Sequence, residues 1–294
     1  MKTTGAHDIL GSLSSASVQD RAVAYAIEAA KSIYRLVLRR IERTQDKVNA
    51  EYNLLNWQKV LSNKAWINAK DLGDFLAPTD QTERLRKVDD RILRIDGQSY
   101  YRYRAGALGD LIARHCGGAK RLVELGAGYG YNLFSLHLSH PDWILKGFDI
   151  SPNGIAAGRE IAAHFGISDK ISMDRIDLTN AADPSFAAIS DQVVLTYFCI
   201  EQIPYAVQKV IENIIAAKPK RVINIEPTTE LLDLTIPRDL VSLLYIRSVD
   251  YQTQLFATLD ELERQGRIRI IARERMRFAP SINNDGCLYC WEPI

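Results

Sequence analysis

The chain has 294 residues, of which 47% are hydrophobic and 25% are charged, and its formal net charge is +1. These values are ordinary for a globular protein, and they lack the strong basic excess that is typical of nucleic-acid-binding proteins. No apolar run approaches the roughly 18 residues that cross a bilayer, and the first residues lack the apolar core of a secretory signal. We therefore expect a cytoplasmic protein that binds neither membrane nor nucleic acid.

The first 119 residues have a mostly helical pattern. Apolar residues recur at steps of three and four between Val18 and about Ile41, which predicts an amphipathic helix; they are Val23, Ile27, Ala30, Tyr34, Val37 and Ile41. We expect this apolar face to pack on the protein core, with a partner-binding or membrane-surface helix as the alternative. Further helices are predicted over residues 53–62, 66–76 and 81–93, with Pro78 breaking the chain between the last two and a turn at residues 96–99.

From Lys120 onward, seven short apolar runs alternate with other segments; they cover residues 121–125, 143–148, 171–176, 192–197, 221–225, 268–272 and 286–291. Helix-compatible segments separate the first five runs, which is typical of a parallel sheet with helical crossovers. Only a loop separates the last two, so they predict a hairpin whose final strand is antiparallel to the rest. We therefore predict two parts, a helical extension over residues 1–119 and a seven-stranded, doubly wound α/β domain over residues 120–294.

The last predicted strand contains the pair Cys287 and Cys290, whose spacing is also found in metal and redox sites. Residues three apart in a strand point to opposite faces of the sheet. No second Cys or His pair stands at zinc-like spacing. We therefore interpret the cysteines as structural thiols in a reducing compartment and predict no metal site.

The first predicted strand runs directly into the glycine-rich turn Glu124-Leu125-Gly126-Ala127-Gly128-Tyr129-Gly130, and a helix-like segment follows at residue 131. This arrangement presents backbone N–H groups and a helix N-terminus to a ligand. Glycine suits such a turn because a side chain would keep the backbone away from the ligand. The turn predicts a nucleotide-like ligand at the carboxyl ends of the strands.

Polar residues also end the next strands of the predicted sheet. Asp149 ends the second strand 25 positions after Glu124, and Asp177 follows the third. A carboxylate at such a strand end can accept hydrogen bonds from both hydroxyls of a ribose. The fourth strand leads into a segment, residues 194–204, that ends in Cys-Ile-Glu-Gln-Ile-Pro.

Together these motifs resemble those of class I S-adenosylmethionine-dependent methyltransferases, over residues 120–294. The resemblance implies a Rossmann-like sheet with an antiparallel last strand and S-adenosylmethionine as the cofactor. It assigns the methionine part of the cofactor to the turn, the ribose to the end of the second strand and the adenine to Asp177. The cofactor-binding residues that we predict on this basis are Glu124, Gly126, Ala127, Gly128, Asn132, Asp149, Ile150 and Asp177. In related enzymes the segment before the first strand folds over the cofactor, which adds Tyr101 and Arg104 as candidates for its carboxylate.

The main alternative is a Rossmann enzyme that binds a nicotinamide or flavin dinucleotide. Its G-x-G-x-x-G fingerprint would place a third glycine at the position of Tyr131. The acidic start of the motif and the terminal hairpin also fit a methyltransferase better. We therefore favour the methyl-donor site.

Candidate catalytic residues follow the fourth and fifth strands; they are Tyr197, Glu201 and Glu226. Histidine is absent from the loops after strands four to seven, which disfavours a histidine-based O-methyltransferase, and several glutamates suit a nitrogen acceptor. We predict N-methylation of a small molecule or a peptide side chain. O-methylation of a sugar or another hydroxylated metabolite, and a non-catalytic subunit that binds the cofactor, remain alternatives. A homodimer also stays open.

Overall fold

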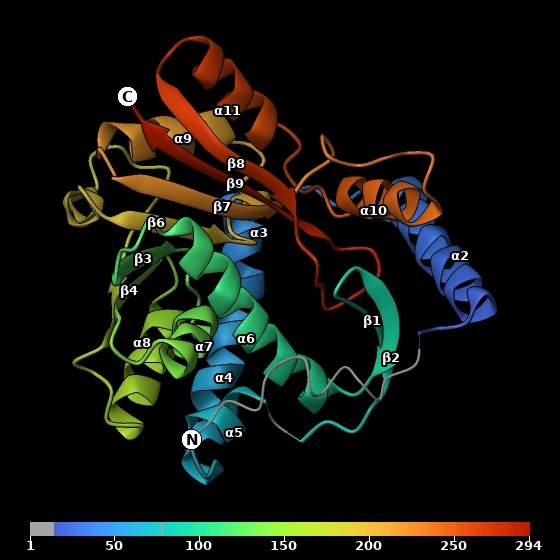
Figure 1. Ribbon diagram of the computed structural model, residues 1–294, viewed down its shortest axis with the longest axis horizontal. Coiled ribbons are helices and arrows are strands. Elements are labelled where there is room, and N and C mark those ends of the chain that lie inside the picture. The colour runs from blue at the N-terminus through green and yellow to red at the C-terminus, as the bar shows by residue number, and fades with distance from the viewer. Residues whose placement is uncertain (1–14, 78) are drawn as a thin grey trace.

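The computed structural model describes residues 15–77 and 79–294, so the first 14 residues and the predicted break at Pro78 lie outside the described residues. Its centre is a seven-stranded sheet with the strand order β5-β4-β3-β6-β7-β9-β8 (Figure 1). The strands are β3 (Arg121–Leu125), β4 (Ile144–Asp149), β5 (Ile171–Arg175), β6 (Val193–Tyr197), β7 (Arg221–Pro227), β8 (Ile268–Arg275) and β9 (Gly286–Pro293). Strands β3 to β7 pair in parallel, whereas β9 is antiparallel to β7 and β8. The predicted doubly wound sheet with an antiparallel last strand is confirmed.

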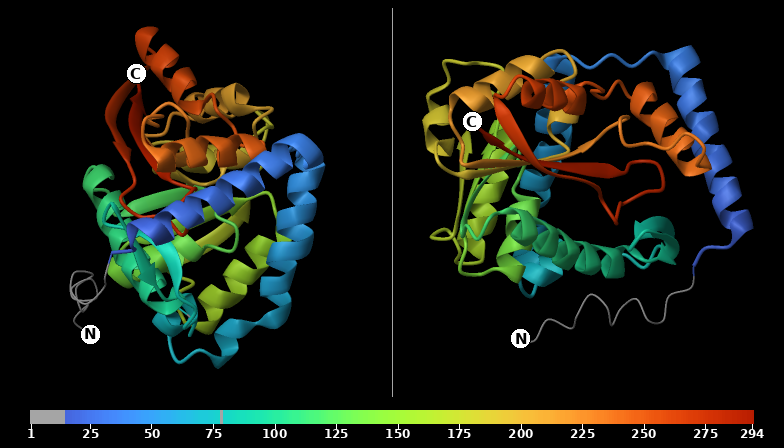
Figure 2. Two further views of the ribbon diagram at one scale, coloured as in Figure 1. Left: turned by 90° about the vertical axis from the view of Figure 1, so that its right-hand side faces the viewer. Right: turned by 45° about the horizontal axis from the view of Figure 1, so that its top comes forward.

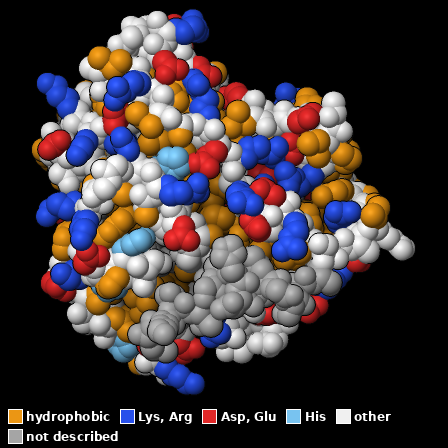
Figure 3. Space-filling view, viewed as in Figure 1, with side chains coloured by type: hydrophobic (Ala, Val, Ile, Leu, Met, Phe, Trp, Pro, Cys, Tyr) orange, Lys and Arg blue, Asp and Glu red, His pale blue; other side chains and the backbone are white. Residues whose placement is uncertain are grey.

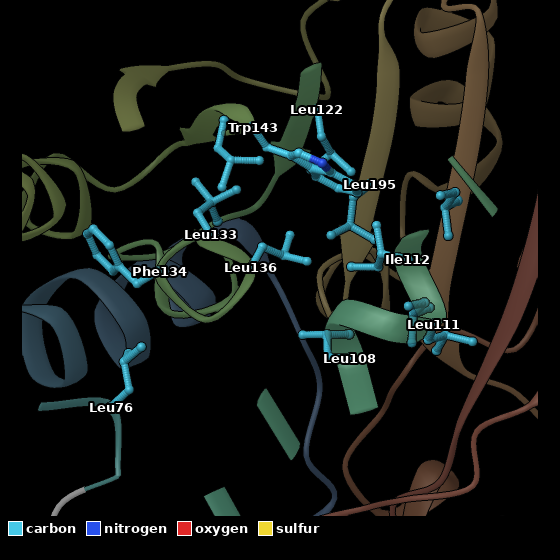
Figure 4. Close-up of a cluster of buried hydrophobic side chains, with 14 of the residues drawn as sticks. Leu76, Leu108, Leu111, Ile112, Leu122, Leu133, Phe134, Leu136, Trp143 and Leu195 are labelled. Atoms are coloured by element: carbon cyan, nitrogen blue, oxygen red, sulfur yellow. The ribbon is translucent and has the colours of Figure 1, made fainter. Parts of the chain in front are cut away.

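Helices cover both faces of this sheet. From α6 onward the helices are α6 (Gly97–His115), α7 (Tyr131–Ser139), α8 (Pro152–His164), α9 (Val207–Ala216), α10 (Pro237–Ser248) and α11 (Leu255–Arg264), with 3-10 turns η4 (Pro184–Ile189) and η5 (Ile200–Gln202). Of these, α10 lies at the side of the molecule rather than over a face of the sheet. Leucines of α6 and α7 pack on Leu122 and Leu195 of the sheet, as Figure 4 shows. Helices α9 and α11 pack on the opposite face. Burial of both faces explains why the strands have near-continuous apolar runs.

The extension is less helical than the sequence pattern predicts. The helix predicted over residues 81–93 is wrong, because this segment forms the antiparallel hairpin β1 (Arg84–Val88) and β2 (Arg91–Ile95). Asp89 and Asp90 form its two-residue turn with φ of 50° and 63°, a conformation that hairpin turns of this length require. The predicted turn at residues 96–99 is the start of α6, where the Asp96 side chain accepts a hydrogen bond from the Ser99 N–H.

The long amphipathic helix is present as α2 (Val18–Tyr34) and the π-helical turn η1 (Arg35–Arg39). It lies against α10 at the side of the molecule rather than on the sheet (Figure 1). The prediction that its apolar face packs on the core is wrong, since Val23, Tyr34 and Val37 are all more than half exposed. Periodicity alone identifies an apolar face but not what covers it.

The chain then turns into a second helical rod made of α3 (Gln45–Asn49), η2 (Ala50–Trp57) and α4 (Gln58–Asn63). Figure 2 shows this rod running at an angle to α2, and it packs on α8. The short elements η3 (Ala65–Asn68) and α5 (Leu72–Leu76) lead back to the β1–β2 hairpin. No helix in the described ranges is long and apolar enough to cross a membrane.

Candidate active site

A cavity of about 730 Å³ lies at the carboxyl ends of the parallel strands. Its walls come from the glycine-rich turn, the loops after β4, β5 and β6, and the rod α3–η2. The volume lies within the usual range of about 300–1,000 Å³ for small-molecule sites. The sheet order reverses between β3 and β6, the place where doubly wound folds bind their ligands.

The glycine-rich turn needs its glycines for conformation and for space. Gly126, Gly128 and Gly130 have φ of 74°, 58° and 89°, in the left-handed region that favours glycine. A Cβ on Gly126 would overlap the Cys199 sulfur, and one on Gly128 would come within 2.7 Å of the Trp57 ring. The turn is therefore enclosed on both sides, and Gly126, Ala127 and Gly128 line the cavity.

Asp149 supports the turn from the end of β4. Its carboxylate accepts hydrogen bonds from the Gly128 N–H at 2.7 Å and from the Ser151 N–H at 2.8 Å. Burial raises the pKa of this carboxyl, and the backbone N–H donors oppose that effect. Asp149, Ile150 and Asp177 all line the cavity, as the sequence predicts for the ribose and adenine side.

Arg104 reaches the cavity from α6. Its buried guanidinium lies between two aromatic rings, with Cζ 5.1 Å from the centre of Tyr131 and 5.0 Å from that of Tyr197. Nη2 donates to Asn132 Oδ1 at 2.7 Å, while Nη1 has no hydrogen-bond partner in the part of the chain that the structure describes. A buried cation with a free donor at a cavity wall fits the carboxylate of a ligand.

Two predicted cofactor residues do not line the cavity. Glu124 is fully buried behind Asn132, whose Nδ2 donates to Glu124 Oε1 at 2.7 Å, and burial raises the pKa of this carboxyl to about 7. Tyr101 packs against Tyr131 with ring centres 6.1 Å apart. Each therefore acts through a neighbour: Glu124 orients Asn132, and Tyr101 supports Tyr131.

The rod over the cavity supplies contacts that sequence reasoning missed. Asn53 Oδ1 accepts hydrogen bonds from the Ser151 hydroxyl at 2.7 Å and from the Asn153 N–H at 3.1 Å. The Trp57 ring meets Tyr129 edge to face at 5.3 Å and covers Gly128. The sequence indicates this lid only through the helix predicted over residues 53–62. That prediction does not show which part of the protein the helix covers.

Glu201 and Gln202, on η5, form a further part of the cavity wall. Gln202 Nε2 donates to Glu201 Oε1, while Glu201 Oε2 has no partner within the described ranges. Burial and the nearby Glu226 raise the pKa of the Glu201 carboxyl well above its usual range. Tyr52 and Tyr251 lie close enough that the charge of Glu201 raises their pKa. The wall thus combines a partly unsatisfied carboxyl with aromatic rings, and Tyr197 adds another.

Glu226, also predicted as catalytic, does not line the cavity. It is completely buried, and its carboxylate accepts the backbone N–H groups of Cys199, Ile200 and Glu201 at 3.1–3.2 Å. These donors belong to the start of η5. Glu226 therefore holds the turn that carries Glu201, rather than meeting a substrate.

Arg43 joins the lid to this wall. Its backbone N–H donates to Asp250 Oδ2 at 2.7 Å, its Nε donates to the Val249 carbonyl at 3.0 Å, and its Nη1 donates to Gln202 Oε1. The guanidinium also lies over the Tyr251 ring at 4.9 Å. The lid is thereby fixed to the wall that carries Glu201 and Gln202 as well as over the glycine-rich turn.

No family model and no curated protein matches the chain. Solved structures do: the cyclase SpnF aligns at 12% identity over 82% of this chain and 96% of its own, with a TM-score of 0.52. A geranyl diphosphate methyltransferase in complex with GPP and sinefungin aligns at 11% identity over 81% and 100%, with a TM-score of 0.50. An O-methyltransferase family 2 protein from Planctomyces limnophilus aligns at 16% identity over 65% of this chain, with a TM-score of 0.49. This chain covers only 56% of that last protein.

At these identities the similarity establishes the fold and nothing finer. The chain has the Rossmann-like fold of class I S-adenosylmethionine-dependent methyltransferases. Its activity has to be argued from its own residues.

Proposed function

We propose that the chain is an S-adenosylmethionine-dependent methyltransferase. The observation that carries this proposal is Arg104, which lines the cavity together with the glycine-rich turn and Asp149 and whose buried Nη1 has no hydrogen-bond partner among the described residues. Arg104 would bind the carboxylate of the methionine part, Asp149 the ribose hydroxyls, and Ile150 and Asp177 would flank the adenine. The sinefungin named for the geranyl diphosphate methyltransferase supports the same ligand class here.

When bound, S-adenosylmethionine would supply an electrophilic methyl group on a sulfonium, with the thioether sulfur as its leaving group. This chain's residues orient the two reactants and exclude water, and orientation contributes about 7–11 kcal/mol in well-aligned systems. The lid residues Tyr52, Asn53 and Trp57 close the cavity from outside. Arg43 holds that lid against the wall that carries Glu201.

For the acceptor we propose a nitrogen, on a small molecule or a peptide side chain. Burial favours the neutral form of Glu201, and a cationic amine beside it would favour the carboxylate instead. As a carboxylate, its Oε2, which has no partner among the described residues, can accept the proton that the amine must lose before attack. Tyr52, which also lines the cavity, adds an aromatic ring of the kind that attracts cations. A hydroxyl acceptor is the alternative, with Glu201 as the base that would take its proton.

The test is methyl transfer from radiolabelled S-adenosylmethionine to matched panels of amines and alcohols, with wild type and Glu201→Gln. We expect amines to be labelled, and the variant to bind S-adenosylmethionine normally but lose turnover. Labelling of alcohols alone would establish the O-methyltransferase alternative. Cofactor binding without transfer to any acceptor would favour the non-catalytic alternative.

A further inference from the structure

The α2–η1 arm exposes an apolar stripe on the side that faces away from α10. Of the 19 large hydrophobic side chains recorded as exposed among the described residues, nine lie between residues 18 and 41. Figure 3 shows hydrophobic side chains gathered at the right-hand edge of the molecule, where Figure 1 places α2 and α10. The arm therefore carries far more exposed apolar surface than its share of the chain.

The stripe has the period of a helix–helix seam. Val23, Ile27, Ala30, Tyr34 and Val37 follow one another at steps of four, three, four and three residues, and all five are exposed. Steps that average 3.5 residues keep an apolar stripe aligned with a partner helix along its whole length. The seam extends over about 21 Å at 1.5 Å per residue.

Charge along the arm selects the partner and its direction. Residues 18–29 contain Asp20, Arg21 and Glu28, a net charge of −1, whereas residues 30–41 contain Lys31, Arg35, Arg39 and Arg40, a net charge of +4. Two copies in parallel would place +4 against +4. Two antiparallel copies avoid this repulsion, because each basic half then lies beside the other's half of net charge −1, and the two-fold axis that relates them makes one surface complementary to itself.

We infer that α2–η1 pairs antiparallel with the same arm of a second copy of this chain, with Ala30 at the two-fold axis. Ala30 is the centre of the seam and its smallest residue, so the two helices can approach most closely there. The arm leads through Arg43 into the lid over the cavity. Pairing would thus fix the start of the lid in each copy.

The test is the mass of the full-length protein in solution, measured by light scattering on a size-exclusion column at protein concentrations of about 10–100 µM. Wild type should have twice the mass of one chain. The double variant I27E/V37E should have the mass of one chain, because both side chains are already exposed and the fold does not depend on them. The matched control Ile271→Glu, at an exposed apolar position on β8, should remain dimeric.

Oxidative crosslinking tests the direction of pairing. Ala30→Cys should crosslink to itself across the two-fold axis, and Val23→Cys should not, since the two Val23 positions lie at opposite ends of an antiparallel seam. Self-crosslinking of Val23→Cys would refute the antiparallel arrangement.

A monomeric wild type, or a dimer that I27E/V37E leaves intact, would overturn the proposal. Two further results would each overturn the proposal and identify a different partner for the apolar stripe. Flotation of a monomeric wild type with phosphatidylserine vesicles would assign it to a membrane surface. A dimer that forms only after residues 1–14 are deleted would assign it to that segment.

Discussion

Replacing Arg104 with methionine should weaken S-adenosylmethionine binding strongly and selectively. Methionine can fill the space between Tyr131 and Tyr197 but offers no donor. Truncating one partner of a buried, charge-assisted contact costs about 2–4 kcal/mol, which corresponds to roughly a 30-fold to 1,000-fold rise in Kd. The Kd of Arg104→Lys should lie between those of wild type and Arg104→Met. A lysine ammonium keeps the charge but cannot donate to Asn132 and to a carboxylate at once, as the guanidinium can.

The assay is calorimetric titration with two ligands. S-adenosylmethionine carries the carboxylate, whereas 5′-methylthioadenosine has the same adenosine and lacks the amino-acid part. Arg104→Met should lose affinity for the first ligand and keep its affinity for the second. An equal loss for both ligands, or no loss for either, would refute the assignment of Arg104 to the carboxylate, and a thermal melt of the variant controls for misfolding.

Three further substitutions test other parts of the account. Burial holds the pKa of Glu124 at about 7, against 4.5 for an ordinary glutamate, so between these values the folded state binds more protons than the unfolded state and stability falls as pH rises. The glutamine of Glu124→Gln cannot ionise, so the variant should be no more stable than wild type near pH 4. Its unfolding free energy should exceed that of wild type by at most about 3 kcal/mol at pH 8. A difference in unfolding free energy that does not depend on pH, measured by denaturant melts, would contradict this. Asp149→Asn places an amide donor against the N–H of Gly128 or Ser151, so it should weaken both titration ligands at least about tenfold, unlike Arg104→Met; unchanged affinity would remove Asp149 from the site. Trp57→Ala removes the cover over Gly128, and hydrogen exchange across residues 45–63 should accelerate; equal protection in the variant would show that Trp57 does not hold the lid.

The sequence patterns predict the sheet well because its signals are local. Each strand is a short apolar run, and its glycine-rich turn and terminal carboxylate follow within a few residues. The β1–β2 hairpin was missed because its signal is the Asp89-Asp90 turn, and this pair has to adopt positive φ without glycine. Its strands also carry arginines and a lysine, as the exposed face of a helix would.

The site was predictable on the side that the sheet supplies and, through the family resemblance, at Arg104 of α6, but not at the lid. Asp149 and Gly128 belong to motifs, whereas Asn53 and Trp57 reach the cavity from residues far away in sequence, and no local pattern assigns their partners. Glu226 shows that a local motif can also mislead. Its position after a strand suggests contact with a substrate, but its carboxylate accepts hydrogen bonds from three backbone N–H groups at the start of η5. Glu201, on the same turn, lines the cavity, and its Oε2 has no partner within the described part of the chain.

The most direct test of the central claim is titration of the wild-type chain with S-adenosylmethionine, S-adenosylhomocysteine and NADH. The account predicts that both adenosyl ligands bind, one per chain, and that NADH does not. Binding of NADH without binding of either adenosyl ligand would contradict it and assign the cavity to dinucleotide chemistry instead.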